Sequence, residues 1–316
     1  MFGRVEGVVL AAMLLVAAVV GGAMWWVSGP GAPTPEVAES ALTDAPDGLA
    51  GLSVSADSAS GDRARARTPS PERRAALEPA PSPTVSPSEP ALPLAGRVVV
   101  LDPGHQLGNS RFPAEVNATV DAGGFTKACN TTGTATAGGY PEATFTWEVA
   151  VELRALLESA GAQVVMTRSS NSADRWGPCI DERGRIGNPG GPGPAADLEL
   201  SLHGDGNLAA GAHGFHVIAP ESRAGWTDDI AAPSLALAQS LRDGLVGVGV
   251  AVSTYLGVDG IDVRGDLGTL NLADKPTVMV ELGNMRDPGD AALMTSASGR
   301  RTYAEGLLAG VTAWLG

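Results

Sequence analysis

The chain has 316 residues, enough for one large domain or two ordinary ones, and its formal net charge is −14. A protein face that binds nucleic acid must be basic to contact phosphates, so this charge argues against nucleic acid as a partner. It also disfavours docking on anionic lipid headgroups, so any contact with a membrane must come from an inserted segment.

Residues 8–27 form an apolar segment without a charged side chain. About 20 apolar residues in a helix span a hydrocarbon core roughly 30 Å thick. Because Arg4 precedes the segment and no Lys or Arg follows closely, residues 1–7 are predicted to be cytoplasmic and the rest to lie outside. We expect a single-pass anchor in the cell membrane with an extracytoplasmic domain, and Trp25 and Trp26 suit its outer interface. The alternative is a signal peptide, cleaved to release a secreted protein, although its apolar region is usually shorter.

Residues 28–95 are rich in Pro, Ala and Ser and contain no aromatic residue. Such a segment cannot bury enough apolar surface to offset the entropy lost on folding. We therefore predict a disordered linker, which its prolines make semi-extended. The composition changes at Gly96, and residues 96–316 are predicted to form the folded domain.

Cys129 and Cys179 are the two cysteines of the chain, and both follow the apolar segment. An even pair outside the cytoplasm favours a disulfide over a metal site or a nucleophile. Two buried free thiols are the alternative.

The elements of the domain follow from the spacing of its apolar residues. A short apolar run rich in β-branched residues predicts a strand at 97–102, and further short apolar runs predict strands at 162–168, 198–203, 214–219 and 277–282. Helical spacing predicts helices at 141–160, 181–187, 232–246 and 301–315. Strands that alternate with helices predict an α/β domain, with a mixed, mainly parallel central sheet between helices on both faces.

Residues able to bind a metal lie at the ends of three predicted strands: His105, His203 and Glu281. Glu142, at the start of the first helix, can face the same crevice, because sites in open α/β sheets form at the carboxyl ends of strands. Two imidazoles and one carboxylate are the usual protein ligands of a hydrolytic zinc, and a further carboxylate is needed to move the proton of the attacking water. Taken singly, a histidine at a strand end is more often a hydrogen-bonded structural residue.

Four motifs occur along the chain in the order in which a known protein family has them. They are VVVLDPGH (98–105), a glutamate before an amphipathic helix (141–168), LELSLHGDGN (198–207) and VELGNMRDP (280–288). With them, the segment 97–316 resembles the zinc-dependent N-acetylmuramoyl-L-alanine amidases of the amidase-3 type, especially the actinobacterial and mycobacterial ones. The resemblance implies a phosphorylase/hydrolase-like amidase fold.

The resemblance also implies the chemistry. His105, Glu142 and His203 become the ligands of one zinc ion per chain, and Glu281 becomes the catalytic carboxylate. The implied reaction is hydrolysis of the amide between N-acetylmuramic acid and L-alanine in peptidoglycan or muropeptides. Two other functions remain open: a catalytically silent peptidoglycan-binding or regulatory module, and a zinc peptidase that cuts within the stem peptide. Since no coiled-coil heptads occur, we expect a monomer.

The chain departs from the family pattern in three places, one of them after Glu281, where Leu-Gly-Asn replaces the Gly-Phe of many relatives. Gln106 and Leu107 follow the first histidine, where many relatives have glycines, and residues 106–139 form a long polar insertion. This insertion contains Cys129, so a disulfide to Cys179 would hold it beside the cleft.

Further polar residues have two interpretations each. Asp102 is a candidate partner that orients His105, or a turn-capping carboxylate. Arg264 and Asn271 are candidate contacts for stem-peptide carboxylates, although a salt bridge between Arg264 and Asp266 is the plainer account. Glu115 competes with Glu142 for the ligand role, and we prefer Glu142 because a helix fixes its position. His213 is interpreted as an exposed loop residue and His216 as a residue on the surface of a strand.

Overall fold

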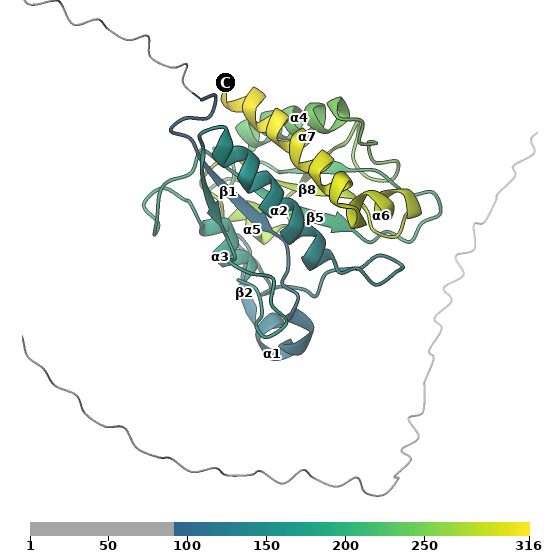
Figure 1. Ribbon diagram of the computed structural model, residues 1–316. Helices are drawn as coiled ribbons and strands as arrows, with labels where there is room; N and C mark the ends of the chain where they lie inside the picture. The colour runs from purple at the N-terminus through teal and green to yellow at the C-terminus, as the bar shows by residue number, and fades with distance from the viewer. Residues whose placement is uncertain (1–91) are drawn as a thin grey trace, which may run out of the picture. The chain divides into compact units, whose positions relative to one another are not determined.

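A six-stranded sheet forms the centre of the domain in the computed structural model, which describes residues 92–316 (Figure 1). The strand order is β4-β1-β5-β8-β6-β7. β6 is antiparallel to β8, whereas the other neighbouring pairs of this sheet are parallel. The predicted α/β domain with a mainly parallel central sheet is therefore confirmed. The strands are β1 (Val98–Pro103), β4 (Gln163–Met166), β5 (Leu198–Asp205), β6 (His216–Pro220), β7 (Ile261–Arg264) and β8 (Thr277–Asn284).

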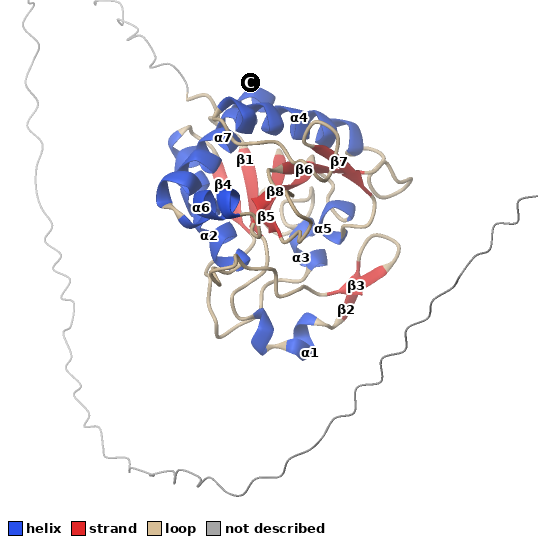
Figure 2. Ribbon diagram, turned by 90° about the vertical axis from the view of Figure 1, so that its right-hand side faces the viewer, coloured by secondary structure: helices blue, strands red, loops and turns tan. Residues whose placement is uncertain are grey.

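One face of the sheet carries the main apolar core. Figure 2 shows this face covered by α2 (Glu142–Ser159), α4 (Ala231–Gly247), α6 (Pro288–Thr295) and α7 (Ala297–Leu315). Alternate residues of β5, namely Leu198, Leu200 and Leu202, are fully buried in one cluster with Phe145 and Leu153 of α2. Because side chains along a strand alternate between faces, the residues between these leucines point to the opposite side.

The opposite face is buried but polar. Asp102, Glu199 and Ser201 are each at most 1% exposed on it. Two ion pairs lie on it: Arg183 contacts Asp102 at 2.5 Å, and Lys275 contacts Glu199 at 2.6 Å. Helices therefore cover both faces, as predicted. The helices on this face are α3 (Ile180–Arg185) and α5 (Gly268–Asn271).

The insertion 106–139 is folded rather than an irregular loop. Its elements are the short helices η1 (Asn109–Arg111) and α1 (Pro113–Val116) and a hairpin of β2 (Thr119–Asp121) and β3 (Thr126–Ala128). The predicted disulfide between Cys129 and Cys179 is present, and it joins the end of the hairpin to the start of α3. The covalent link holds the insertion against the polar face of the sheet.

Each element predicted from the sequence is present, with ends shifted by a few residues. The sequence did not predict β7, α5, α6 or the elements of the insertion. The predicted anchor at 8–27 lies outside the described residues, as does the linker up to residue 91. Leu94, placed in the linker by the sequence, is fully buried in the core. Between residues 92 and 316, no helix has the length and apolarity needed to cross a membrane.

Candidate metal centre

The loop after β1 brings His105 over the sheet. His105 has a φ of 59°, a left-handed conformation that non-glycine residues adopt infrequently. The preceding Gly104 lets the ring of His203 pack against the loop, because a Cβ on Gly104 would lie 2.4 Å from Cε1 of that ring. Gly133, from the insertion, also lies close to the site: a Cβ there would be 2.9 Å from both Glu142 Oε2 and His105 Cδ2. Two glycines thus allow the backbone to enclose the histidines.

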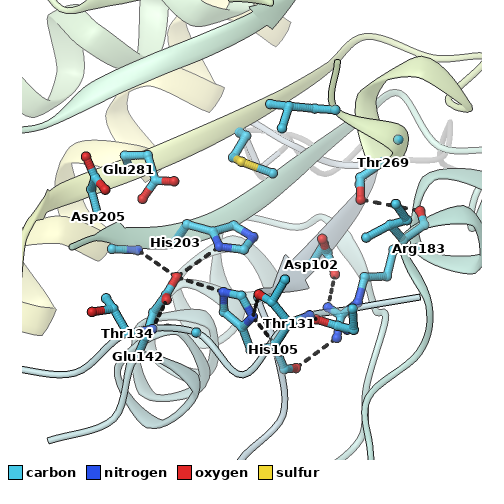
Figure 3. A pocket seen from close by; sticks show the side chains of 18 of the residues that line it. Asp102, His105, Thr131, Thr134, Glu142, Arg183, His203, Asp205, Thr269 and Glu281 are labelled. Carbon is cyan, nitrogen blue, oxygen red and sulfur yellow. Dashed lines mark hydrogen bonds and ion pairs between the residues drawn. The ribbon is translucent and has the colours of Figure 1, made fainter. Parts of the chain in front are cut away.

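The structure brings His105, Glu142 and His203 together from three different elements. Oε1 of Glu142 lies 3.1 Å from Nε2 of His105 and 2.9 Å from Nδ1 of His203 (Figure 3). One ligand atom from each of the three side chains lies within 4.8 Å of the other two. Around a tetrahedral zinc with bonds of about 2.1 Å, ligand atoms are about 3.4 Å apart, so the donor set and its spacing fit zinc.

Neighbouring backbone groups orient two of these side chains. Nδ1 of His105 lies 3.1 Å from the carbonyl oxygen of Thr131, to which it can donate, and this leaves Nε2 free to face Glu142. The carboxylate of Glu142 accepts hydrogen bonds from the backbone N–H of Thr134 at 2.9 Å and of Gly204 at 3.2 Å. These hydrogen bonds fix the imidazole of His105 and the carboxylate of Glu142 before a metal ion binds.

Opposite charges dominate the electrostatics of the cluster. Burial raises the pKa of Glu142, but the charges and hydrogen bonds of His105 and His203 outweigh it and hold that pKa far below its usual range. Burial in turn lowers the pKa of His105, and the facing Glu142 carboxylate reverses this into a net increase. Glu142 is therefore ionised at neutral pH, which a metal ligand requires.

Glu281 lies beside the cluster on the next strand. It is the register partner of His203 across the β5–β8 pair, so both side chains lie on the polar face. Figure 3 shows its carboxyl group near that of Asp205. Burial, followed by the negative charges of Glu142 and Asp205, raises the pKa of Glu281 well above the ordinary value. Its Oε2 atom is buried and has no hydrogen-bond partner among residues 92–316. Glu281 is thus a carboxyl group that can hold and release a proton.

A cavity of about 410 Å³ opens onto these residues. His105, His203, Glu142 and Glu281 line it, together with Lys127 of the hairpin, Leu267 and Thr269. Lys127 donates to the backbone carbonyl of Asp266 at 2.6 Å, which ties the hairpin to the segment before α5. The insertion therefore forms one wall of the cavity.

The remaining candidates do not reach the cluster as ligands. Asp102 accepts hydrogen bonds from Thr167, Ser201 and Arg183 and contacts neither imidazole, so its link to His105 runs through Arg183. Arg264 donates twice to Asp266, which supports the plainer account.

Asn271 is fully buried and donates to the carbonyls of Ala122 and Gly265, so it holds the hairpin rather than facing the cavity. The interpretation of His216 as a surface residue is wrong: it is 1% exposed and is the register partner of Glu281 on β6. Glu115 belongs to α1 in the insertion and is not part of the cluster. The sequence did not single out Thr131, which acts through its own carbonyl oxygen, or the buried Arg168 and Arg183, which donate to backbone carbonyls of distant segments.

Comparison with known proteins agrees with the fold. The family model described as N-acetylmuramoyl-L-alanine amidase (Amidase_3) matches residues 99–313. The chain is 44% identical over 225 residues to the N-acetylmuramoyl-L-alanine amidase Rv3717 of Mycobacterium tuberculosis, covering 70% of this chain and 88% of that protein.

Two solved structures are also similar. The apo form of the N-acetylmuramyl-L-alanine amidase Ami1 from Mycobacterium abscessus has a TM-score of 0.64 and 43% identity, with 70% of this chain and 100% of that chain covered. Ami1 from Mycobacterium smegmatis has a TM-score of 0.64 and 38% identity, with 70% and 98% covered. The chain therefore belongs to the Amidase_3 family of N-acetylmuramoyl-L-alanine amidases.

Proposed function

We propose that this chain uses one zinc ion, held by His105, Glu142 and His203, to hydrolyse the amide between N-acetylmuramic acid and L-alanine in peptidoglycan. The observation that carries the proposal is the convergence of the three ligand atoms within 4.8 Å of one another beside the buried carboxyl group of Glu281. Family membership supplies the substrate class.

The residues divide the chemistry between them. A zinc ion in this site would polarise the scissile carbonyl and make a water molecule acidic enough to attack at neutral pH. Glu281 takes the proton of that water and returns it to the nitrogen of L-alanine, so the amide breaks into a muramoyl carboxylate and a free amine. The raised pKa of Glu281 suits this role, because the group must carry the proton between the two steps. Thr131 and the backbone of Thr134 keep the ligands oriented.

The location of the enzyme is part of the proposal. Residues 8–27 are apolar and uncharged, which supports a single-pass anchor that leaves the catalytic domain on the outer side of the cell membrane. The disulfide supports the same side, because disulfides persist in oxidising compartments. Cleavage of the segment would release the enzyme as a secreted protein. We propose that it acts as a monomer.

The decisive experiment incubates the full chain with purified muropeptides and identifies the products by mass spectrometry. We expect a stem peptide with a free N-terminal L-alanine, loss of this product after treatment with a chelator, and its return when zinc is added. The chelator-treated protein, restored with zinc, is its own control. No product under any condition would indicate a silent wall-binding module, and fragments cut inside the stem peptide would indicate a peptidase.

A further inference from the structure

Two buried arginines surround the loop that carries His105. The carbonyl oxygens of three consecutive residues, Pro103, Gly104 and His105, all accept hydrogen bonds from guanidinium groups. Arg183 donates to the carbonyl of Pro103 at 2.9 Å and to that of His105 at 2.8 Å. Arg168 donates to the carbonyl of Pro103 at 2.9 Å and to that of Gly104 at 3.4 Å. The loop that leads to the first ligand is therefore held from both sides.

Each arginine also ties this loop to a second part of the site. Arg168 donates to the carbonyl of Ala143 at 2.8 Å, in the first turn of the helix that begins with Glu142. Arg183 belongs to α3 and donates to the carbonyl of Pro178 at 2.9 Å, the residue before the disulfide-bonded Cys179. Arg168 thus couples the positions of two ligands, and Arg183 couples the His105 loop to the segment fixed by the disulfide.

Asp102 keeps the two cations in place. Arg168 and Arg183 are 5% and 3% exposed, and burying two like charges so close together is unfavourable. Burial, with repulsion from Arg183 second, lowers the pKa of Arg168 to about 9. Asp102 forms an ion pair with Arg183 and attracts Arg168, which offsets part of this repulsion. A charged network of this kind is retained for what it orients, because apolar side chains would fill the same space at lower cost.

We propose that Arg168 and Arg183 are positioning residues that hold the His105 loop in its left-handed, zinc-binding conformation before the ion arrives. Without them, His105 at a φ of 59° relaxes to an ordinary conformation and its imidazole leaves the cluster. Their loss therefore weakens zinc binding itself, beyond any loss of stability. The inference rests on the proposed zinc site.

The test compares three single variants of the full chain: Arg183→Met, Arg168→Met and Lys275→Met. Lys275 is the matched control, because it is a 2% exposed cation on the same face that donates to the carbonyl of Gly184 and contacts neither ligand loop. Its partner Glu199 has a pKa raised to about 7, mainly by burial, so it can accept a proton when the ammonium is removed. Zinc affinity is measured by competition with a chromogenic chelator, and stability by thermal unfolding of the zinc-free protein.

We expect all three variants to unfold at lower temperature, but only the two arginine variants to bind zinc roughly 10 to 100 times more weakly, the usual range for groups that orient metal ligands. Zinc affinity equal to wild type in the arginine variants, or an equal loss in Lys275→Met, overturns the inference. A wild-type chain that binds no zinc instead overturns the proposed function.

Arg183→Lys keeps the inference testable if the methionine variants fail to fold. A lysine preserves the charge next to Asp102 but lacks the planar fork that reaches the carbonyls of Pro103 and His105 together. We expect near wild-type folding with zinc affinity reduced about tenfold. Full affinity with lysine would mean that the buried charge alone matters, and the positioning role would be excluded.

Discussion

The two faces of the central sheet are built on opposite principles, although the same strands supply both. On β5, Leu198, Leu200 and Leu202 point into an apolar core, while Ser201 and His203 point to the polar face. The apolar face requires only side chains of suitable volume and shape, because the hydrophobic effect that stabilises it is not directional. The polar face needs a partner for each group, because an unpaired buried polar group costs about as much as a lost hydrogen bond.

Two carboxylates of the polar face differ in how their oxygens are used. Asp102 is fully satisfied by Thr167, Ser201 and Arg183. Glu281, on the same face, is less buried than Asp102 and has one buried oxygen without a hydrogen-bond partner among residues 92–316. A satisfied carboxylate stabilises the fold, whereas an unsatisfied one is available to a substrate or a water molecule. The two faces therefore predict different responses to mutation.

The largest effect is expected from Glu281→Gln. The amide has nearly the same shape but cannot take the water proton, so we expect turnover of muropeptides to fall at least about a hundredfold, as is typical when a general base is removed. Metal analysis should find zinc retained, because the three ligands are untouched. Glu152→Gln, on an exposed part of α2 where Glu152 pairs with Arg301, is the control and should retain activity. Undiminished turnover in Glu281→Gln would refute the mechanism.

Removal of the disulfide tests how much the covalent link stabilises the polar face, whose buried apolar cluster consists only of Ile218, Leu270 and Met279 among the described residues. The bridge closes a segment with a sequence separation of 50. In the chain-entropy model, a loop of this size contributes about 4 kcal/mol by restricting the unfolded chain. We expect the double variant Cys129→Ala/Cys179→Ala to lose about this much free energy of unfolding in urea titrations. A loss below about 1 kcal/mol would show that the contacts of the insertion hold it without the covalent link.

Leu200→Ala tests the apolar face in isolation. Leu200 is fully buried, and its truncation should lower the free energy of unfolding by about 3 kcal/mol through lost burial and the cavity left behind. The zinc affinity of the folded protein should stay within about twofold of wild type, since a two-sided strand separates the cavity from the ligands. If Leu200→Ala weakened zinc binding as much as Arg183→Met, the two faces would not be independent.

The sequence predicted what depends on local pattern. The β-branched runs at β1 and β8, the alternating leucines of β5 and the helical spacing of α2 identify the elements, and a polar residue at a strand end identifies each ligand candidate. The insertion was not resolved into elements because β2 and β3 have three residues each, too few for any periodicity. The four residues of β7 gave no clear pattern for the same reason.

The errors at the site have a common physical cause. Alternation along β6 correctly separates His216 from its apolar neighbours, but only the fold shows that this polar side of the sheet is also covered. Arg168 and Arg183 bind backbone carbonyls more than 60 residues away in sequence. A carbonyl has no signature in the sequence, so the residues that orient the ligands cannot be predicted from it, whereas the ligands themselves can.

The smallest effect is expected where the polar face meets solvent, at the ion pairs of Asp266 with Arg264 and Lys127. All three side chains are more than one third exposed, so Asp266→Asn should lower the free energy of unfolding by only about 0.5 kcal/mol, and by less in high salt. The backbone carbonyl of Asp266 still accepts from Lys127 in this variant, so the hairpin stays attached.

The lowered pKa of Asp266 determines how the effect of Asp266→Asn on stability changes with pH. Hydrogen bonds from Arg264 are the largest cause that lowers the pKa of Asp266 from 3.8 to about 2. A carboxyl group with a lowered pKa in the folded state stabilises the fold above its unfolded pKa and loses this contribution as the pH falls through the folded value. The difference in free energy of unfolding between wild type and Asp266→Asn should therefore be constant above a pH of about 4, fall between pH 4 and pH 2, and vanish below about pH 2. A difference above about 2 kcal/mol, or one that grows on acidification, would contradict this prediction. The exposed edge would then behave like the buried network around Asp102, where removal of one partner leaves the other charge buried and unpaired.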